Sequence, residues 1–80
     1  MSEISVFRRK LKYMNASELR QAGEVAQTRI DFNKKLKEAI AYIANSPDRK
    51  TIKEYNKTVS NMNKDLKGWE DLLTAIRRLQ

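Results

Sequence analysis

Hydrophobic residues recur at alternating spacings of three and four along the C-terminal part of the chain. This alternation places one apolar side chain per turn on a single face of an α-helix, as in packed helices with a heptad pattern. The opposite face is polar and largely basic, and two leucines widen the apolar face toward the C-terminus. The predicted interaction seam comprises Ile52, Tyr55, Val59, Met62, Leu66, Trp69, Leu72, Leu73, Ile76 and Leu79.

A second helix is predicted from about residue 16 to about residue 45. Asn15 is a favourable N-cap, and Glu18 stands three residues later, where the acid of a capping box belongs. We interpret Arg29 as a snorkelling side chain and Asn33 as a boundary residue, with a polar contact to a partner as the alternative. The apolar stripe of this helix is broad: Leu19, Ala22, Val25, Ala26, Ile30, Phe32, Leu36, Ala39, Ile40 and Ile43.

The sequence Ser46-Pro47-Asp48 ends the second helix, because the residue before a proline disfavours the helical conformation. Proline is tolerated at the first position of a helix, and Ser46 can cap a helix from about residue 47 to about residue 79. A connection this short between two helices of similar length predicts an antiparallel hairpin.

A short N-terminal helix, from about residue 3 to about residue 14, is predicted from Ile4, Phe7, Leu11 and Met14. Such a helix is marginal alone, so its stripe must dock on another surface. The widened end of the last helix is predicted either to receive this helix or to form a subunit interface. Gly68 is interpreted as a local weakness of the last helix, with the admission of a close neighbour as the alternative. The expected fold is thus all-α, a long antiparallel helical hairpin with a short N-terminal helix, in one helical domain over residues 1–80.

The composition argues against an enzyme. The chain of 80 residues has no Cys and no His, which removes disulfides, thiol chemistry, the usual zinc sites and the best proton-transfer group near neutral pH. No two of the carboxylates stand three or four residues apart, so no helical face presents paired acids. Gly23 and Gly68 stand alone, so there is no glycine-rich phosphate loop. We predict a non-enzymatic protein with no cofactor, no metal and no small-molecule substrate.

The net charge of +7 attracts anionic partners. Phosphate contacts need little more than a basic stripe, whereas reading bases needs a recognisable module or aromatic platforms. We find neither, because Phe7, Phe32, Tyr55 and Trp69 fall on apolar seams, while Tyr42 adjoins its stripe. A solvated basic face is therefore favoured, and nucleic-acid binding stays open. The candidate residues for an anionic partner are Arg8, Arg9, Lys12, Lys53, Lys57, Lys64 and Lys67.

A chain this short buries a modest core, so we expect a homo-oligomer or a protein partner. An acidic row of Glu24, Asp31 and Glu38 is interpreted as solvated, with pairing to the lysine row of another subunit as the alternative. The longest apolar run, residues 39–44, is far shorter than the roughly 20 residues of a membrane span. No cleaved signal peptide is recognised. We expect no membrane span, and the location stays open between the cytoplasm and export without a cleaved signal peptide.

Residues 36–80 resemble the needle subunits of type III secretion systems. The resemblance lies in LKEAI at 36–40 before NSPD, in YNKTVSNMN at 55–63, and in LKGWEDLLTAI at 66–76. It implies a small exported protein that stacks into a hollow helical filament. The C-terminal helix would line the inside, and the apolar seams would be buried between subunits.

The sequence therefore predicts a helical protein that acts by protein–protein interaction or self-assembly, with a needle-type filament subunit as its most specific form. The alternative is a small basic regulator of the kind that phages and plasmids encode. Such a regulator would bind nucleic acid or inhibit a host protein that handles nucleic acid.

Overall fold

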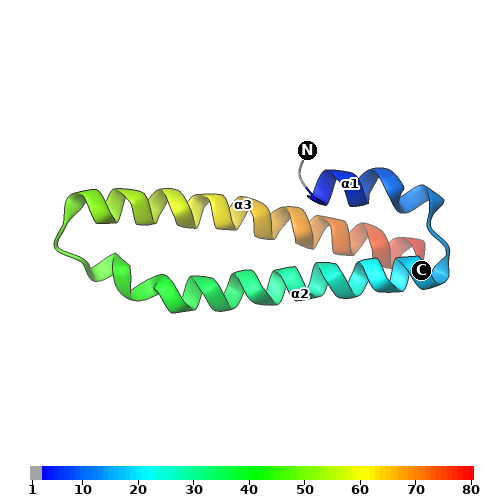
Figure 1. The fold of residues 1–80 in the computed structure, drawn as a ribbon, viewed down its shortest axis with the longest axis horizontal. Helices are drawn as coiled ribbons and strands as arrows, with labels where there is room; N and C mark the ends of the chain where they lie inside the picture. The colour runs from blue at the N-terminus through cyan, green and yellow to red at the C-terminus, as the bar shows by residue number, and fades with distance from the viewer. Residues whose placement is uncertain (1–2) are drawn as a thin grey trace.

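Two long helices, packed side by side, make up most of the molecule. The computed structural model describes residues 3–80, which form α1 (Glu3–Lys10), α2 (Ala16–Ile40) and α3 (Arg49–Leu79) and contain no β-strand. In Figure 1, α2 and α3 form an antiparallel hairpin, and α1 lies against the C-terminal half of α3 and runs in the same direction. The body measures 51 × 21 × 15 Å. The predicted all-α hairpin with a short N-terminal helix is confirmed.

The first two α-helices end earlier than predicted, and each continues as a 3₁₀ segment. After α1 the chain forms η1 (Leu11–Tyr13), and after α2 it forms η2 (Ala41–Asn45). Ile40 marks the second change, with φ −97° and ψ 0°. Short 3₁₀ segments of this kind tighten the ends of α-helices. They lie within the ranges of about 3–14 and 16–45 that were predicted to be α-helical throughout.

The corner between α2 and α3 is capped by Asp48, so α3 begins at Arg49 and the prediction of a cap at Ser46 is wrong. The Asp48 carboxylate accepts hydrogen bonds from the Lys50 backbone N–H at 3.2 Å and from the Thr51 hydroxyl at 2.7 Å. Ser46 is held extended, as expected before proline, and its hydroxyl oxygen accepts from the Asp48 N–H at 3.3 Å. The Thr51 hydroxyl and then the Lys50 N–H lower the pKa of Asp48, because both stabilise the carboxylate.

This cap should weaken in acid. The pKa of Asp48 is lowered in the folded chain from its ordinary 3.8, so its contribution is fully present above pH 3.8 and is lost as the pH falls through the folded value. Asp48→Asn keeps a capping acceptor without the charge. In urea unfolding at about pH 6 and about pH 2.5, the wild type is expected to lose more stability than this variant. Equal losses in both proteins would contradict a role for the carboxylate.

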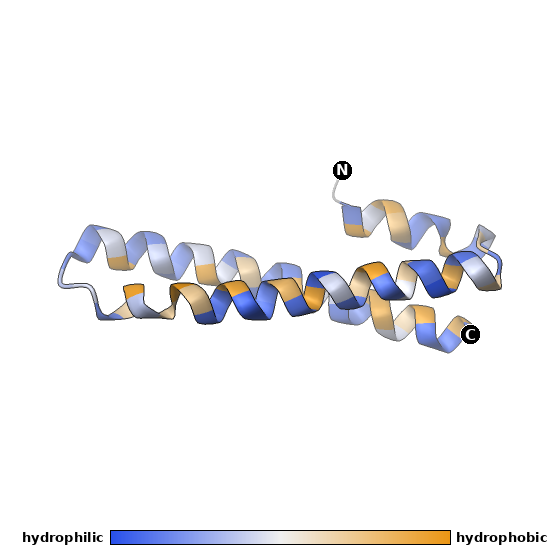
Figure 2. Cartoon of the chain, turned by 60° about the horizontal axis from the view of Figure 1, so that its bottom comes forward, coloured by the Kyte–Doolittle hydropathy of each residue, from blue (hydrophilic) through white to orange (hydrophobic). Residues whose placement is uncertain are grey.

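The core lies at the end of the hairpin that α1 covers. Leu72 and Ile76 are fully buried, and α2 contributes the small buried residues Ala22 and Ala26 to the same cluster. Figure 2 shows the hydrophobic segments of the two long helices alternating with hydrophilic ones at helical spacing. The other buried members of this core are Leu11, Leu19, Ile30, Trp69 and Leu73.

The N-terminal helix docks on α3 through aromatic and aliphatic contacts. The rings of Phe7 and Trp69 meet edge to face, with centroids 6.0 Å apart and planes at 66°. A Cβ atom added at Gly68 would lie 2.8 Å from Cδ1 of Ile4, so the missing side chain makes room for α1. The interpretation of Gly68 as a mere weak point is therefore wrong, and the alternative of a close neighbour holds. Of the two uses predicted for the widened end of α3, the docking of the N-terminal helix is confirmed.

Two polar residues that interrupt the stripe of α2 are used within the chain. Asn33 is buried, and its Nδ2 donates a hydrogen bond to the Asp65 carboxylate at 3.2 Å. Arg29 donates to Glu3 at 3.2 Å, which ties the start of α1 to α2. The prediction of Asn33 as a boundary residue is wrong, because it is buried and bonded to α3. Arg29 keeps an exposed side chain, as a snorkelling residue does, and pairs with Glu3 at the surface.

Candidate interaction surfaces

The predicted seam of α3 is largely covered by the chain itself. Its C-terminal half is buried, apart from Leu66, which is half-buried, and Leu79, which is 54% exposed. The buried members are Met62, Trp69, Leu72, Leu73 and Ile76, and the half-buried members toward the corner are Ile52, Tyr55 and Val59. The seam therefore serves first to pack α3 against α2 and α1.

An apolar stripe on the outside of α2 is left open. Phe32 is 60% exposed and Leu36, one turn further along, is 39% exposed. Val25 precedes Phe32 by seven residues and is half-buried on the same side of the helix. Phe32 was predicted to belong to the packed stripe, which is wrong. At 3.6 residues per turn it lies about 120° from the centre of the buried face of α2, on a flank that α3 does not cover. We call Val25, Phe32 and Leu36 the α2 outer stripe.

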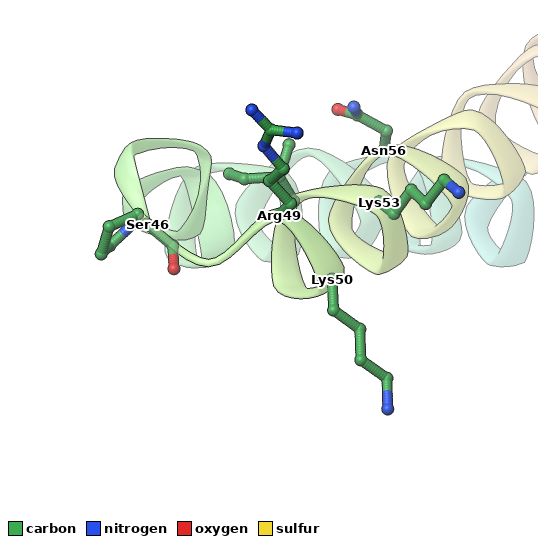
Figure 3. A pocket seen from close by; sticks show the side chains of 7 residues that line it. Ser46, Arg49, Lys50, Lys53 and Asn56 are labelled. Carbon is green, nitrogen blue, oxygen red and sulfur yellow. The ribbon is translucent and has the colours of Figure 1, made fainter.

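The corner carries cations that do not converge. A surface groove of about 690 Å³ is lined by Ser46, Pro47, Arg49, Lys50, Ile52, Lys53 and Asn56. In Figure 3, Arg49 and Asn56 extend to one side of α3, whereas Lys50 extends to the opposite side. The first amides of α3 are also closed to an anion, because Asp48 accepts the Lys50 N–H. The corner therefore offers dispersed charge without a defined anion site.

The predicted lysine row of α3 is a solvated face. Lys53, Lys57, Lys64 and Lys67 are all exposed along one side of the helix. Lys67 lies 4.0 Å from Asp71, a surface pair that contributes little. The acidic row of Glu24, Asp31 and Glu38 is likewise exposed on α2.

The basic residues near the end of α1 share a hollow with an exposed aromatic ring. A hollow of about 540 Å³ is lined by Arg8, Arg9, Leu11, Lys12, Tyr13 and Leu79. Tyr13 is 78% exposed, and the Lys12 Nζ lies 5.1 Å from the centre of its ring. Tyr13 was not predicted as a candidate functional residue. The available signal was its position between Leu11 and Met14, off the apolar stripe and beside a cation.

Residues 3–80 contain no group of three or more His, Cys, Asp or Glu side chains placed to hold a metal ion. Nor does any helix in this described part combine the length and apolar character needed to cross a membrane. Comparison of the chain with protein-family models, with curated proteins and with solved structures gives no match. The function is therefore inferred from the surfaces described above.

Proposed function

We propose that this chain is a non-enzymatic helical protein that acts by self-assembly. The observation that carries the proposal is the α2 outer stripe, where Phe32 and Leu36 stand one turn apart on the same side of α2 and are both exposed. Fully burying one such side chain contributes about 1.5–3 kcal/mol. Two neighbouring side chains on a rigid helix therefore supply a useful driving force for association.

A second copy of the chain is the partner that the charges favour. The acidic row of α2, Glu24, Asp31 and Glu38, repeats every seven residues, and Lys57 and Lys64 on α3 have the same spacing. Both rows are exposed and lie on different helices of the hairpin. When α2 of one copy packs beside α3 of the next, opposite charges face each other and set the direction of packing.

Packing of two different surfaces is heterologous, and it produces an open helical array when the rotation between copies does not close a ring. A needle-type filament is the most specific form of this proposal. It is supported by the resemblance of residues 36–80 to needle subunits and by the two complementary outer rows.

Light scattering after size-exclusion chromatography, over a wide range of protein concentration, tests self-assembly. The molar mass of the wild type is expected to rise with concentration, whereas Phe32→Ser combined with Leu36→Ser should remain monomeric with unchanged helicity. Tyr42→Ser is the matched control, because Tyr42 is an exposed aromatic residue outside the stripe. A wild type that stays monomeric throughout, or a double variant that assembles like the wild type, would overturn the proposal.

Electron microscopy of the concentrated protein tests the filament itself. Fibres are expected from the wild type, and replacement of Glu24, Asp31 and Glu38 by Gln should reduce their formation. A closed dimer as the largest species would contradict the filament while leaving self-assembly in place.

A further inference from the structure

The end of α1 presents a fixed set of cations. Leu11 is buried in the core and anchors η1, so Lys12 and Tyr13 project from a backbone that is held in place. Arg8 and Arg9 lie one turn earlier in α1, and both are exposed. Together with Leu79 these side chains line one hollow. We call Arg8, Arg9, Lys12 and Tyr13 the Tyr13 site.

The positive charge of the Tyr13 site is not neutralised within the described residues. The ion pairs of residues 3–80 join Arg29 to Glu3 and Lys67 to Asp71, and neither involves this site. Glu3 is the one acid of α1 and is held at the opposite end of the helix. The last turn of α3 adds Arg77 and Arg78 at the same end of the molecule. The negative end of a helix dipole amounts to about half an elementary charge, so it neutralises only a small part of this positive charge.

Tyr13 adds a feature that a plain basic patch lacks. Its ring is exposed and stands beside the Lys12 ammonium group. Proteins that bind single-stranded nucleic acid combine cations along the backbone with an aromatic face on which a base stacks. The hollow, about 540 Å³, is open to solvent, so a strand that crosses it can reach the ring.

Two other anionic partners fit less well. A membrane surface needs a broad apolar face for insertion. The apolar stripe of α1 packs on the core, which leaves only the separate exposed side chains of Val6, Tyr13 and Leu79 at this end of the described residues. Reading a duplex needs a helix projecting into a groove, whereas α1 is eight residues long and lies flat along α3 (Figure 1).

We propose that the Tyr13 site binds single-stranded nucleic acid, with a base stacked on Tyr13 and phosphates held by Arg8, Arg9 and Lys12. This function is separate from self-assembly, because the Tyr13 site and the α2 outer stripe share no residue. Of the seven cations predicted for an anionic partner, this proposal selects the three that line one hollow with an aromatic ring.

Fluorescence anisotropy with labelled dT15 and rU15 oligonucleotides at several salt concentrations tests the role of the cations. Replacing Arg8, Arg9 and Lys12 by Ala is expected to weaken binding at least about tenfold and to reduce the slope of log K against log salt by about 2. Replacing Lys53, Lys57 and Lys64 by Ala removes the same charge elsewhere and should change affinity less than about threefold. Equal losses in both variants, or no binding by the wild type near 100 mM salt, would overturn the proposal.

A second pair of variants tests the stacking. Tyr13→Ser should weaken oligonucleotide binding by about tenfold, whereas Tyr13→Phe, which keeps the ring, and Tyr42→Ser should bind like the wild type. Heparin, an anionic chain without bases, should be insensitive to Tyr13→Ser. An unchanged affinity of Tyr13→Ser for dT15 would contradict the stacked base. Binding to vesicles of anionic phospholipid without binding to either oligonucleotide would overturn the assignment of the partner. Because Tyr13 is exposed, these variants keep the fold, and circular dichroism provides the check.

Discussion

Leu72→Ala should lower the free energy of unfolding by about 2–5 kcal/mol, the range measured when a buried leucine is truncated in a core. Leu72 is fully buried in the cluster that contains Trp69 and Ile76. Removing its side chain loses the burial of apolar surface. It also leaves a cavity, because the packed helices around it relax only partially. A domain this small has little stability in reserve, so urea unfolding followed by circular dichroism should show a large fall in the midpoint.

Leu79→Ala is the matched control. Leu79 is the same residue type on the same helix, two turns further along, but it is 54% exposed. Its truncation should cost less than about 1 kcal/mol, because most of its surface is already in water. Similar losses in the two variants would mean that the core is not centred where Leu72 lies.

Phe7→Ala should release α1 from the hairpin. The edge-to-face contact with Trp69 is the principal aromatic anchor of this helix, and an isolated helix of eight residues is not stable in water. Trp69 is the only tryptophan of the chain and is buried. Its fluorescence emission should therefore shift to the red in the variant, and the helical signal should fall by roughly the share of α1.

Val6→Ala tests the same helix on its other side. Val6 is exposed, so its truncation should leave the Trp69 emission unchanged. Gly68→Leu approaches the contact from α3 by filling the space that Ile4 occupies, and it should reproduce the red shift of Phe7→Ala. Wild-type emission in Phe7→Ala would show that other contacts are sufficient to hold α1.

Local signals predicted most of the backbone. Asn15 accepts the Glu18 N–H at 2.9 Å while the Asn15 N–H donates to the Glu18 carboxylate at 3.2 Å, which is the capping box read from the sequence. Pro47 and the heptad spacing of α3 were sufficient for the hairpin, because both act within one or two turns of the chain. The apolar stripe of α1 and the widened apolar face at the end of α3 were sufficient to predict that α1 docks on α3.

The burial of residues on the flanks of the helices was not predictable in the same way. Whether a flanking side chain is covered depends on where a third helix lies, and spacing along one helix does not specify this. Leu72 and Leu79 are seven residues apart on the same flank, yet one is buried and the other is exposed. Phe32 and Gly68 were misassigned for the same reason, since α1 covers the flank of Gly68 and leaves that of Phe32 open.

The core lies at one end of the hairpin. Protection of the backbone amides from exchange with solvent should therefore increase along the hairpin, from the Pro47 corner toward that end. From η2 through the first three turns of α3 no residue is fully buried, whereas the buried residues of α3 lie from Met62 onward. Amides near Pro47 should therefore exchange with solvent through small local openings, while amides near Ile76 should exchange only when the whole chain unfolds. The hairpin thus combines a tip, at the Pro47 corner, whose residues are not fully buried with a base that holds the core. Added loops or inserted peptides should be tolerated at the tip without loss of the fold.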